Sequence, residues 1–324
     1  MNDNKLMNRA ADNIRILAAS MVEKAKSGHP GGAMGGADFI NVLYAEYLQY
    51  DPQNPKWEGR DRFFLDPGHM SPMLYSQLAL IGKFTLDELK QLRQWGSPTP
   101  GHPEVDVMRG IENTSGPLGQ GHVFAVGAAI AAKFLAARTG NPTFNKETIY
   151  AYISDGGIQE EISQGAGRIA GHLGLDNLIM FYDSNDIQLS TETKDVISED
   201  TAMKYRAWGW NVIEINGNDF QLQSHVICDI LGKRNIKACQ RRRTVLINRI
   251  ELVRCEIRAR RHSQFALRYG LYIREISGCL CACLRCSFCC PLCTLLCKSC
   301  HRSCHAADQH KCYDFSFHIF SSFC

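Results

Sequence analysis

Asp155 and Asn185 occupy equivalent places in the sequence, because each lies just beyond a compact β-rich run and thirty positions separate them. In a parallel sheet the carboxyl ends of neighbouring strands meet at one edge, so the two side chains are predicted to lie side by side. A carboxylate and an amide oxygen are hard ligands suited to Mg²⁺ or Ca²⁺. A metal held by so few protein oxygens usually shares its remaining positions with a phosphate.

Gly156 and Gly157 follow Asp155 directly, and this pair would let a phosphate approach the backbone at the start of the next helix. Free N–H groups at a helix N-terminus favour anions. The predicted ligand is therefore a metal-bound diphosphate. Two other interpretations stay open on spacing alone: a simple turn formed by an Asp-Gly pair, and ordinary nucleotide binding.

The elements that must position these residues follow from two kinds of periodicity. Up to residue 138, apolar residues recur mainly at helical spacing, and glycine-rich loops separate the helices. After residue 146, β-rich runs alternate with helical stretches, which favours an α/β fold with a doubly wound parallel sheet. The expected helices cover residues 6–26, 37–48, 71–80, 85–94, 123–138, 160–173 and 200–208, and the expected strands cover residues 62–65, 148–153, 177–182 and 210–215.

The composition divides the chain into two parts. Its 324 residues, 45% hydrophobic and 21% charged, suffice for two soluble domains of about 150 residues each and exclude a disordered or collagen-like chain. Residues 1–221 carry a net charge of −8 and no cysteine, whereas residues 222–324 carry +11 and all 15 cysteines. The first part is typical of a reduced, cytoplasmic enzyme domain. No apolar run reaches the roughly 18 residues of a membrane span, and the N-terminus is polar, so no membrane association is expected.

Six short motifs rich in glycine and histidine lie in a fixed order before residue 220. They are Gly28-His29-Pro30-Gly31-Gly32, Gly68-His69, Gly101-His102-Pro103-Glu104, Gly116-Pro117-Leu118-Gly119-Gln120-Gly121, the Asp155-Gly156 pair with Asn185, and Ala170-Gly171-His172-Leu173. In this order and spacing they resemble the N-terminal, diphosphate-binding domain of the transketolases. The resemblance runs continuously from about Asn8 to Asp219 and implies the thiamine-diphosphate-binding type of α/β fold.

The resemblance implies thiamine diphosphate and Mg²⁺ (or Ca²⁺) as cofactors. It assigns the divalent ion to the side chains of Asp155 and Asn185 and to the carbonyl of Ile187. The residues that it places at the organic cofactor are His69, Gly156 and Asn185 at the diphosphate, Gly116, Pro117 and Leu118 in the turn at the rings, and Glu160, which matches a carboxylate that many members carry. A second family carboxylate is Gly165 here, so the carboxylate network between subunits is not expected to be complete.

Two further histidines match positions that the family places beside the substrate. His29 and His102 are expected to bond the hydroxyls of a sugar phosphate and to assist proton transfer. Imidazole suits this work because its unperturbed pKa, about 6.5, lies near working pH. His122 and His172 are interpreted as structural, because the family motif does not fix the first and a packed helical pattern contains the second.

The function that the resemblance implies is that of a transketolase of the pentose phosphate pathway, which moves a two-carbon ketol unit from a ketose phosphate to an aldose phosphate as a homodimer. Full members continue into a pyrimidine-binding domain that supplies an activating glutamate. We recognise no such domain here, and therefore expect an inactive truncated product. Two alternatives stay open: the N-terminal subunit of a split transketolase or related thiamine-diphosphate enzyme, and a non-enzymatic remnant that binds metal or nucleic acid.

Residues 222–324 form a basic, Cys-rich tail in which we recognise no fold pattern and no further strand of the first domain. Paired cysteines such as Cys283 and Cys286 are compatible with zinc binding, but clear folding spacers between the pairs are missing. Charge, cysteine content and family resemblance all change near Gln221, which favours out-of-frame translation from that point. The expected organisation is an incomplete diphosphate-binding domain over residues 1–221 and an unrelated tail, with no nucleic-acid partner.

Overall fold

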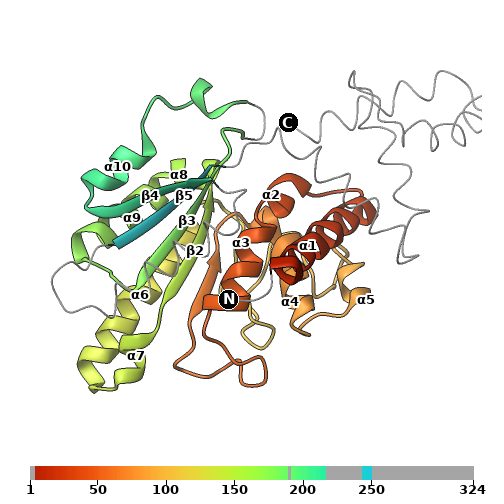
Figure 1. The fold of residues 1–324 in the computed structure, drawn as a ribbon, viewed down its shortest axis with the longest axis horizontal. Helices are drawn as coiled ribbons and strands as arrows, with labels where there is room; N and C mark the ends of the chain where they lie inside the picture. Colours follow the sequence, from red (N-terminus) through yellow and green to blue (C-terminus); the bar gives the residue numbers. More distant parts are fainter. Residues whose placement is uncertain (1–3, 189–190, 217–242, 250–324) are drawn as a thin grey trace, which may run out of the picture. The chain divides into compact units, whose positions relative to one another are not determined.

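A parallel β-sheet forms the centre of the computed structural model, which describes residues 4–188, 191–216 and, as backbone, 243–249. The strands are β1 (Arg62–Leu65), β2 (Ile149–Ser154), β3 (Leu178–Ser184), β4 (Trp210–Asn216) and β5 (Arg243–Arg249). Their order in the sheet is β1-β2-β3-β5-β4, and every neighbouring pair is parallel (Figure 1). The α/β class with a parallel sheet, predicted from the alternation of strands and helices, is confirmed.

Helices cover both faces of this sheet (Figure 1). The helical segments on the described residues are α1 (Asn4–Ala25), α2 (Pro30–Gly35), α3 (Ala37–Val42), the π-helical turn η1 (Leu43–Tyr47), η2 (Gly68–Met70), α4 (Ser71–Leu80), α5 (Leu86–Leu89), α6 (Gln120–Thr139), α7 (Pro142–Lys146), α8 (Asp155–Gln159), α9 (Glu161–Leu173), η3 (Thr193–Asp195) and α10 (Thr201–Ala207). Alternate strand residues divide between two buried clusters, as expected for a sheet covered on both sides. Phe63 and Tyr152 pack with α1, α3 and α4, whereas Phe64 and Ile153 pack with α6, α9 and α10.

Two expected helices are shorter than their sequence patterns indicate. The stretch at 85–94 yields only α5, which begins at a capping box between Thr85 and Glu88. It cannot continue as a helix through Arg93, whose φ of 62° lies in the left-handed region. The stretch at 37–48 forms α3 and then changes to the wider turn of η1.

Strand β5 was not predicted. The expectation of no recognisable strand after Asp219 is wrong for residues 243–249, where the backbone pairs with β3 on one side and β4 on the other. The run Thr244-Val245-Leu246-Ile247 has the β-branched, apolar character of a central strand. Arginine-rich surroundings obscured that pattern. The paired cysteines of the tail lie outside the described residues.

Helix α6 is, by length and composition, the one helix in the described ranges that could cross a membrane. The core helix of a soluble protein passes the same test. Ala125, Val126 and Ala129 of α6 belong to the buried cluster over β2, where small side chains allow a close approach to the sheet. Packing against the sheet accounts for the small buried side chains of α6, whereas larger apolar residues such as Phe124 and Phe134 are exposed.

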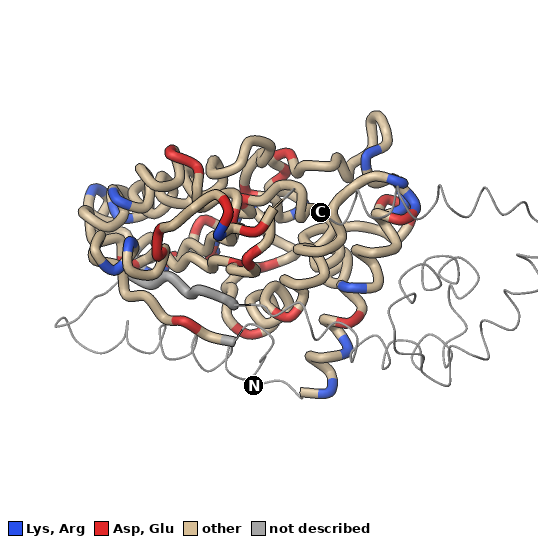
Figure 2. Tube along the Cα trace, turned by 90° about the horizontal axis from the view of Figure 1, so that it is seen from above, with Lys and Arg blue, Asp and Glu red and all other residues tan. Residues whose placement is uncertain are grey.

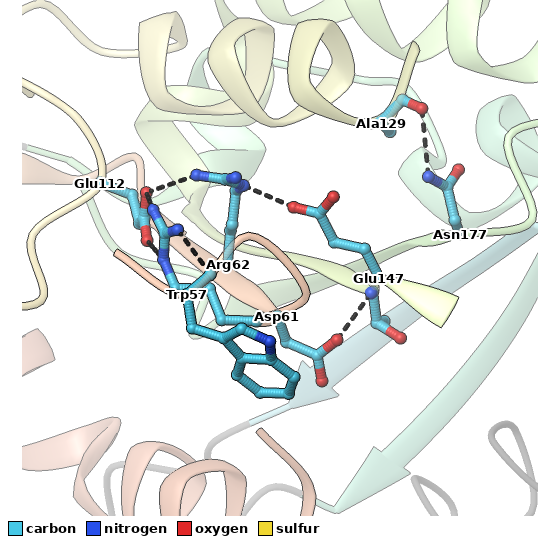
Figure 3. Close-up of polar contacts among 9 residues, drawn as sticks. Trp57, Asp61, Arg62, Glu112, Ala129, Glu147 and Asn177 are labelled. Atoms are coloured by element: carbon cyan, nitrogen blue, oxygen red, sulfur yellow. Dashed lines mark hydrogen bonds and ion pairs between the residues drawn. The ribbon is translucent and has the colours of Figure 1, made fainter. Parts of the chain in front are cut away.

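Figure 3 shows an ion-pair network near the amino-terminal ends of β1 and β2. Both oxygens of Glu112 accept from Arg60, at 2.9 and 3.0 Å, and one also accepts from Arg62 at 3.3 Å. Arg62 donates in turn to Glu147. The side chains of Arg60 and Glu112 are each only 9% exposed, so these charges depend on one another for compensation. The network fastens the 106–113 segment to the end of the sheet opposite the strand exits.

Glu112→Gln should therefore destabilise the fold strongly. The amide cannot balance two guanidinium groups, and leaving a buried charge unpaired typically costs about 3–5 kcal/mol. Urea unfolding followed by circular dichroism measures the change. Asp87→Asn breaks only the exposed pair with Lys90 and should leave the midpoint unchanged. Equal midpoints for the two variants would show that the Glu112 network does not stabilise the domain.

Candidate functional site

Asp155 is the first residue of α8, directly beyond β2, and its side chain is buried at 2% exposure. One carboxylate oxygen accepts from the hydroxyl of Tyr182. The other accepts from the backbone N–H of Asn185 at 3.0 Å. The structure thus brings together the two strand exits that the thirty-residue spacing predicts to be neighbours. Burial raises the pKa of Asp155, and the nearby charge of Asp186 adds to this effect.

Asn185 follows the last residue of β3 and is half-buried. Its side-chain oxygen accepts from the N–H of Ile187 at 3.1 Å, so the amide closes a short turn that carries Ile187 to the same edge. The main chain of Asp186 within this turn has a φ of 63°, in the left-handed region that Asp tolerates better than most residues. The three predicted metal ligands therefore lie together within one loop and one helix start.

The donor set of this edge fits a divalent cation. Among the described residues no Lys or Arg forms an ion pair with Asp155, although its carboxylate is buried. The described ranges contain no group of three or more His, Cys, Asp or Glu side chains that could hold a metal by themselves. A cation on Asp155, Asn185 and the Ile187 carbonyl would need further oxygens, which a diphosphate can supply. In Figure 2, Asp and Glu positions are numerous in the middle of the described body.

The glycine turn before α6 lies against this edge. A Cβ on Gly156 would stand 3.2 Å from Leu118 Cδ1, so the start of α8 and the 116–118 turn are in contact. Gly116 and Pro117 are exposed, and a Cβ on Gly116 would meet nothing within 4 Å. The turn leaves open space beside a backbone that has few side-chain atoms, as a bound cofactor requires.

Glu160 and Gly165 belong to the same region. Glu160 is exposed and precedes α9, and its Cβ would lie 2.9 Å from a Cβ on Gly119. Gly165 has open space around its Cβ position. The carboxylate expected at Glu160 is thus accessible beside the turn, whereas a side chain at residue 165 is missing and nothing replaces it within the described residues.

Three of the predicted histidines converge from three separate segments: His29 from the start of α2, His69 from η2 and His102 from the loop after α5. The rings of His29 and His69 meet edge to face with their centroids 4.9 Å apart. His102 lies beside them, because a Cβ on Gly68 would be 3.0 Å from its Cδ2. Burial lowers the pKa of all three, to about 4 for His69. They are therefore neutral imidazoles at pH 7, able to accept as well as donate hydrogen bonds.

Arg93 was not selected from the sequence, yet its charge acts on all three histidines. It is a secondary cause, after burial, of the lowered pKa values of His29, His69 and His102. Its guanidinium donates to Ser27 Oγ at 2.9 Å, and its backbone N–H donates to Thr99 at 3.0 Å. The Trp95 side chain that follows is fully exposed, so this tryptophan is not part of the core.

Asp66 is the second residue that the sequence analysis missed. It follows β1 and precedes the Gly68-His69 motif, and its side chain is completely buried. Burial raises the pKa of Asp66 to about 6, against the effect of hydrogen bonds from backbone N–H groups of the Gly119–His122 segment. The sequence feature that could have identified Asp66 is its position directly after an expected strand, like those of Asp155 and Asn185.

His122, which the sequence pattern leaves outside the candidate site, lies in the packed interior. Its ring is completely buried, and Nδ1 lies 2.8 Å from Ser163 Oγ, which links α6 to α9. Burial without a charged partner lowers the pKa of His122 to about 4. The imidazole therefore stays neutral in the folded chain at pH values where it is protonated in the unfolded chain.

This difference predicts a pH-dependent contribution to stability. Between pH 6.5 and about 4, unfolding allows His122 to bind a proton, so the free energy of unfolding falls by about 1.4 kcal/mol per pH unit through this group as the pH is lowered. His122→Gln lacks this slope. The measurement is urea unfolding of both proteins at several pH values between 4.5 and 7, and parallel stability curves would contradict a neutral buried imidazole.

Comparison with known proteins places this geometry in a family. The profile described as "Transketolase, thiamine diphosphate binding domain" matches residues 6–244. The transketolase of Staphylococcus epidermidis is 47% identical over 213 residues, covering 65% of this chain and 32% of that protein. Transketolase 1 of Escherichia coli is 47% identical over 213 residues, covering 64% and 32%. The structure of transketolase from Leishmania mexicana superposes with a TM-score of 0.70 at 40% identity, covering 75% of this chain and 36% of that one.

The matches cover most of this chain but only part of each relative. The chain spans about a third of the length of the curated relatives it matches. The profile match begins in α1 and ends within β5, so it includes every strand exit that carries a predicted site residue. The chain belongs to the transketolase family, and its residues 6–244 correspond to the family's thiamine-diphosphate-binding domain.

Proposed function

We propose that this chain binds thiamine diphosphate through a divalent cation, Mg²⁺ or Ca²⁺, at the edge of the sheet where β2 and β3 end, and that the domain serves a transketolase. The observation that supports this proposal most strongly is that Asp155 and Asn185 are neighbours: Asp155 Oδ2 accepts from the backbone N–H of Asn185 at 3.0 Å. The Asp155 carboxylate is buried, and no described Lys or Arg forms an ion pair with it. Asp155, Asn185 and the carbonyl of Ile187 would hold the cation. The reaction would transfer a two-carbon ketol unit from a ketose phosphate to an aldose phosphate.

The glycine turns and His69 would hold the organic cofactor. Gly156 and His69 are proposed for the diphosphate, and the exposed turn at Gly116, Pro117 and Leu118 for the rings, with Glu160 beside it. When bound, the cofactor supplies a stabilised carbanion centre, which no protein side chain provides. The chain's own residues orient it and exclude water around its charged end.

His29 and His102 are proposed for the substrate side. Both rings are neutral at pH 7 because burial and the charge of Arg93 lower their pKa values. A neutral imidazole can accept a proton from a sugar hydroxyl at one nitrogen and donate from the other. Their position next to His69 would place the reacting end of a sugar phosphate close to the ring turn.

A second copy of the chain is the proposed macromolecular partner. Helices α6 and α9 pack together, yet they leave large apolar side chains exposed on their outer sides. These are Phe124, Ile130, Phe134 and Leu135 of α6 and Ile162, Ile169 and Leu173 of α9. Apolar residues gathered in this way are typical of a subunit interface. We propose a cytoplasmic homodimer that uses neither a membrane nor a nucleic acid.

Isothermal titration of the 324-residue chain with thiamine diphosphate tests the cofactor assignment. Binding is expected with Mg²⁺ present and should be lost in EDTA, because without a cation the buried carboxylate of Asp155 would repel the diphosphate. Thiamine without phosphates should not bind under either condition. Binding of thiamine diphosphate with equal affinity in EDTA would contradict the proposed bridge.

One alternative stays open beside this proposal: the chain would be the N-terminal component of an enzyme whose remaining domains lie on another polypeptide. Recovery of such a polypeptide with the chain, together with transketolase turnover by the mixture, would favour this arrangement.

A further inference from the structure

We propose that Asp66 is a positioning residue that fixes the 116–122 turn against the start of α8 and thereby sets the affinity for the diphosphate cofactor. The inference rests on the proposed function and adds a residue that does not itself contact the cofactor. Three loops meet at Asp66: the exit of β1, the turn that leads into α6, and the first turn of α8. The last two carry Leu118 and Gly156, which touch one another at the proposed site.

The carboxylate of Asp66 accepts hydrogen bonds from the first N–H groups of α6. Oδ2 accepts from Gly119 N at 3.1 Å, and Oδ1 accepts from His122 N at 3.3 Å. The N–H of Gly121 also bonds to this carboxylate. These groups lack partners inside the helix, and a negative charge at this end is favourable to the helix dipole. A single side chain therefore determines where the turn ends and α6 begins.

Missing side chains on the surrounding glycines make this arrangement possible. A Cβ on Gly121 would lie 2.5 Å from Asp66 Cα, so the first turn of α6 rests directly on the backbone beyond β1. A Cβ on Gly157 would lie 2.3 Å from Asp66 Oδ2. Gly119 has a φ of 85°, which an L side chain rarely adopts. The carboxylate of Asp66 thus lies between the first turn of α6 and the first turn of α8, both of which adjoin the proposed cofactor site.

Asp61 provides a matched control on the same strand. It lies directly before β1, where Asp66 lies directly after it, and it is also buried. Its carboxylate accepts from Gln49 N at 3.0 Å and from Thr148 N at 2.7 Å. Figure 3 shows Asp61 with the ion-pair network at the opposite end of the strand from Asp66. The two aspartates have the same chemistry and similar burial, but only one touches the turn.

The test compares Asp66→Asn with Asp61→Asn in the 324-residue chain. Hydrogen exchange without cofactor reports the N–H groups of Gly119, Gly121 and His122, and titration with thiamine diphosphate and Mg²⁺ reports affinity. Asp66→Asn should speed exchange at those amides and weaken cofactor binding, each by about tenfold or more, because charge-assisted bonds are lost. Asp61→Asn should change neither, even where its thermal midpoint falls as far. Unchanged exchange and affinity in Asp66→Asn would overturn the proposal.

Two further outcomes are decisive. If the parent chain binds no thiamine diphosphate, the proposed function fails, whereas the exchange measurement still decides whether Asp66 fixes the turn. If Asp66→Asn does not fold, Gly157→Ala replaces it, since the added methyl displaces the carboxylate while leaving its charge. Gly157→Ala should then speed exchange at the same three amides, and exchange equal to that of the parent would contradict the role of Asp66.

Discussion

Asp155→Ala should abolish Mg²⁺-dependent binding of thiamine diphosphate to this chain. The substitution removes the one carboxylate among the three proposed metal ligands, and the diphosphate then loses the ion that joins it to the protein. The remaining oxygens of Asn185 and Ile187 are neutral and cannot offset the charge of the cation. We expect affinity to fall by about a hundredfold or more, measured by isothermal titration at saturating Mg²⁺.

Asp176→Ala is the matched control for this experiment. Asp176 forms an ion pair with Lys133 just before the amino-terminal end of β3, whereas Asn185 lies just beyond its other end. Its loss should leave cofactor affinity unchanged. Circular dichroism of both variants separates loss of the site from loss of the fold. A folded Asp155→Ala chain that keeps the parent affinity would exclude Asp155 as a metal ligand.

A polypeptide of these 324 residues should show almost no transketolase turnover on its own. The described residues form one edge of the proposed cofactor site, and the family resemblance places the glutamate that activates the aminopyrimidine in a further domain. The diphosphate site alone can hold the anionic end of the cofactor without aligning its reactive carbon. Misplacement by about 1 Å already costs on the order of a hundredfold in rate.

The measurement uses purified chain, thiamine diphosphate, Mg²⁺ and a ketose phosphate with an aldose phosphate, compared with an intact transketolase at equal concentration. We expect less than about one hundredth of the control rate. The coding DNA provides an independent comparison: because the family match continues past Gln221 to residue 244, a second reading frame that encodes a pyrimidine-binding domain beyond that residue would support out-of-frame translation of the tail. Turnover close to that of the control would show that residues 222–324 or another subunit complete the site.

Much of the fold was accessible from periodicity alone. The residues of β2 and β3 are almost continuously apolar, because helices cover both faces of the sheet. Strand β5 was missed since its apolar run is short and lies between arginines. The end of α5 was misplaced because Arg93 adopts a left-handed backbone conformation, which an arginine in the sequence does not predict.

The candidate site was predictable where it depends on strand exits and only partly where it depends on packing. Asp155 and Asn185 could be paired from their spacing, since the parallel register fixes which residues are neighbours. His29, His69 and His102 come from separate segments of the chain, and only the family resemblance connected them. Asp66 accepts hydrogen bonds from backbone amides, and the charge of Arg93 lowers the pKa values of neighbouring histidines. Such roles depend on the path of the chain in three dimensions, which no local pattern encodes.

The position of the metal tests the proposed site most directly. We would crystallise the chain with thiamine diphosphate and Mn²⁺ in place of Mg²⁺ and locate the manganese by its anomalous scattering. We expect one peak within coordination distance of Asp155, the Asn185 side-chain oxygen and the Ile187 carbonyl, with the diphosphate completing the ligand set. A cofactor bound with its metal elsewhere, for example among the cysteines of the tail, would contradict the proposed site.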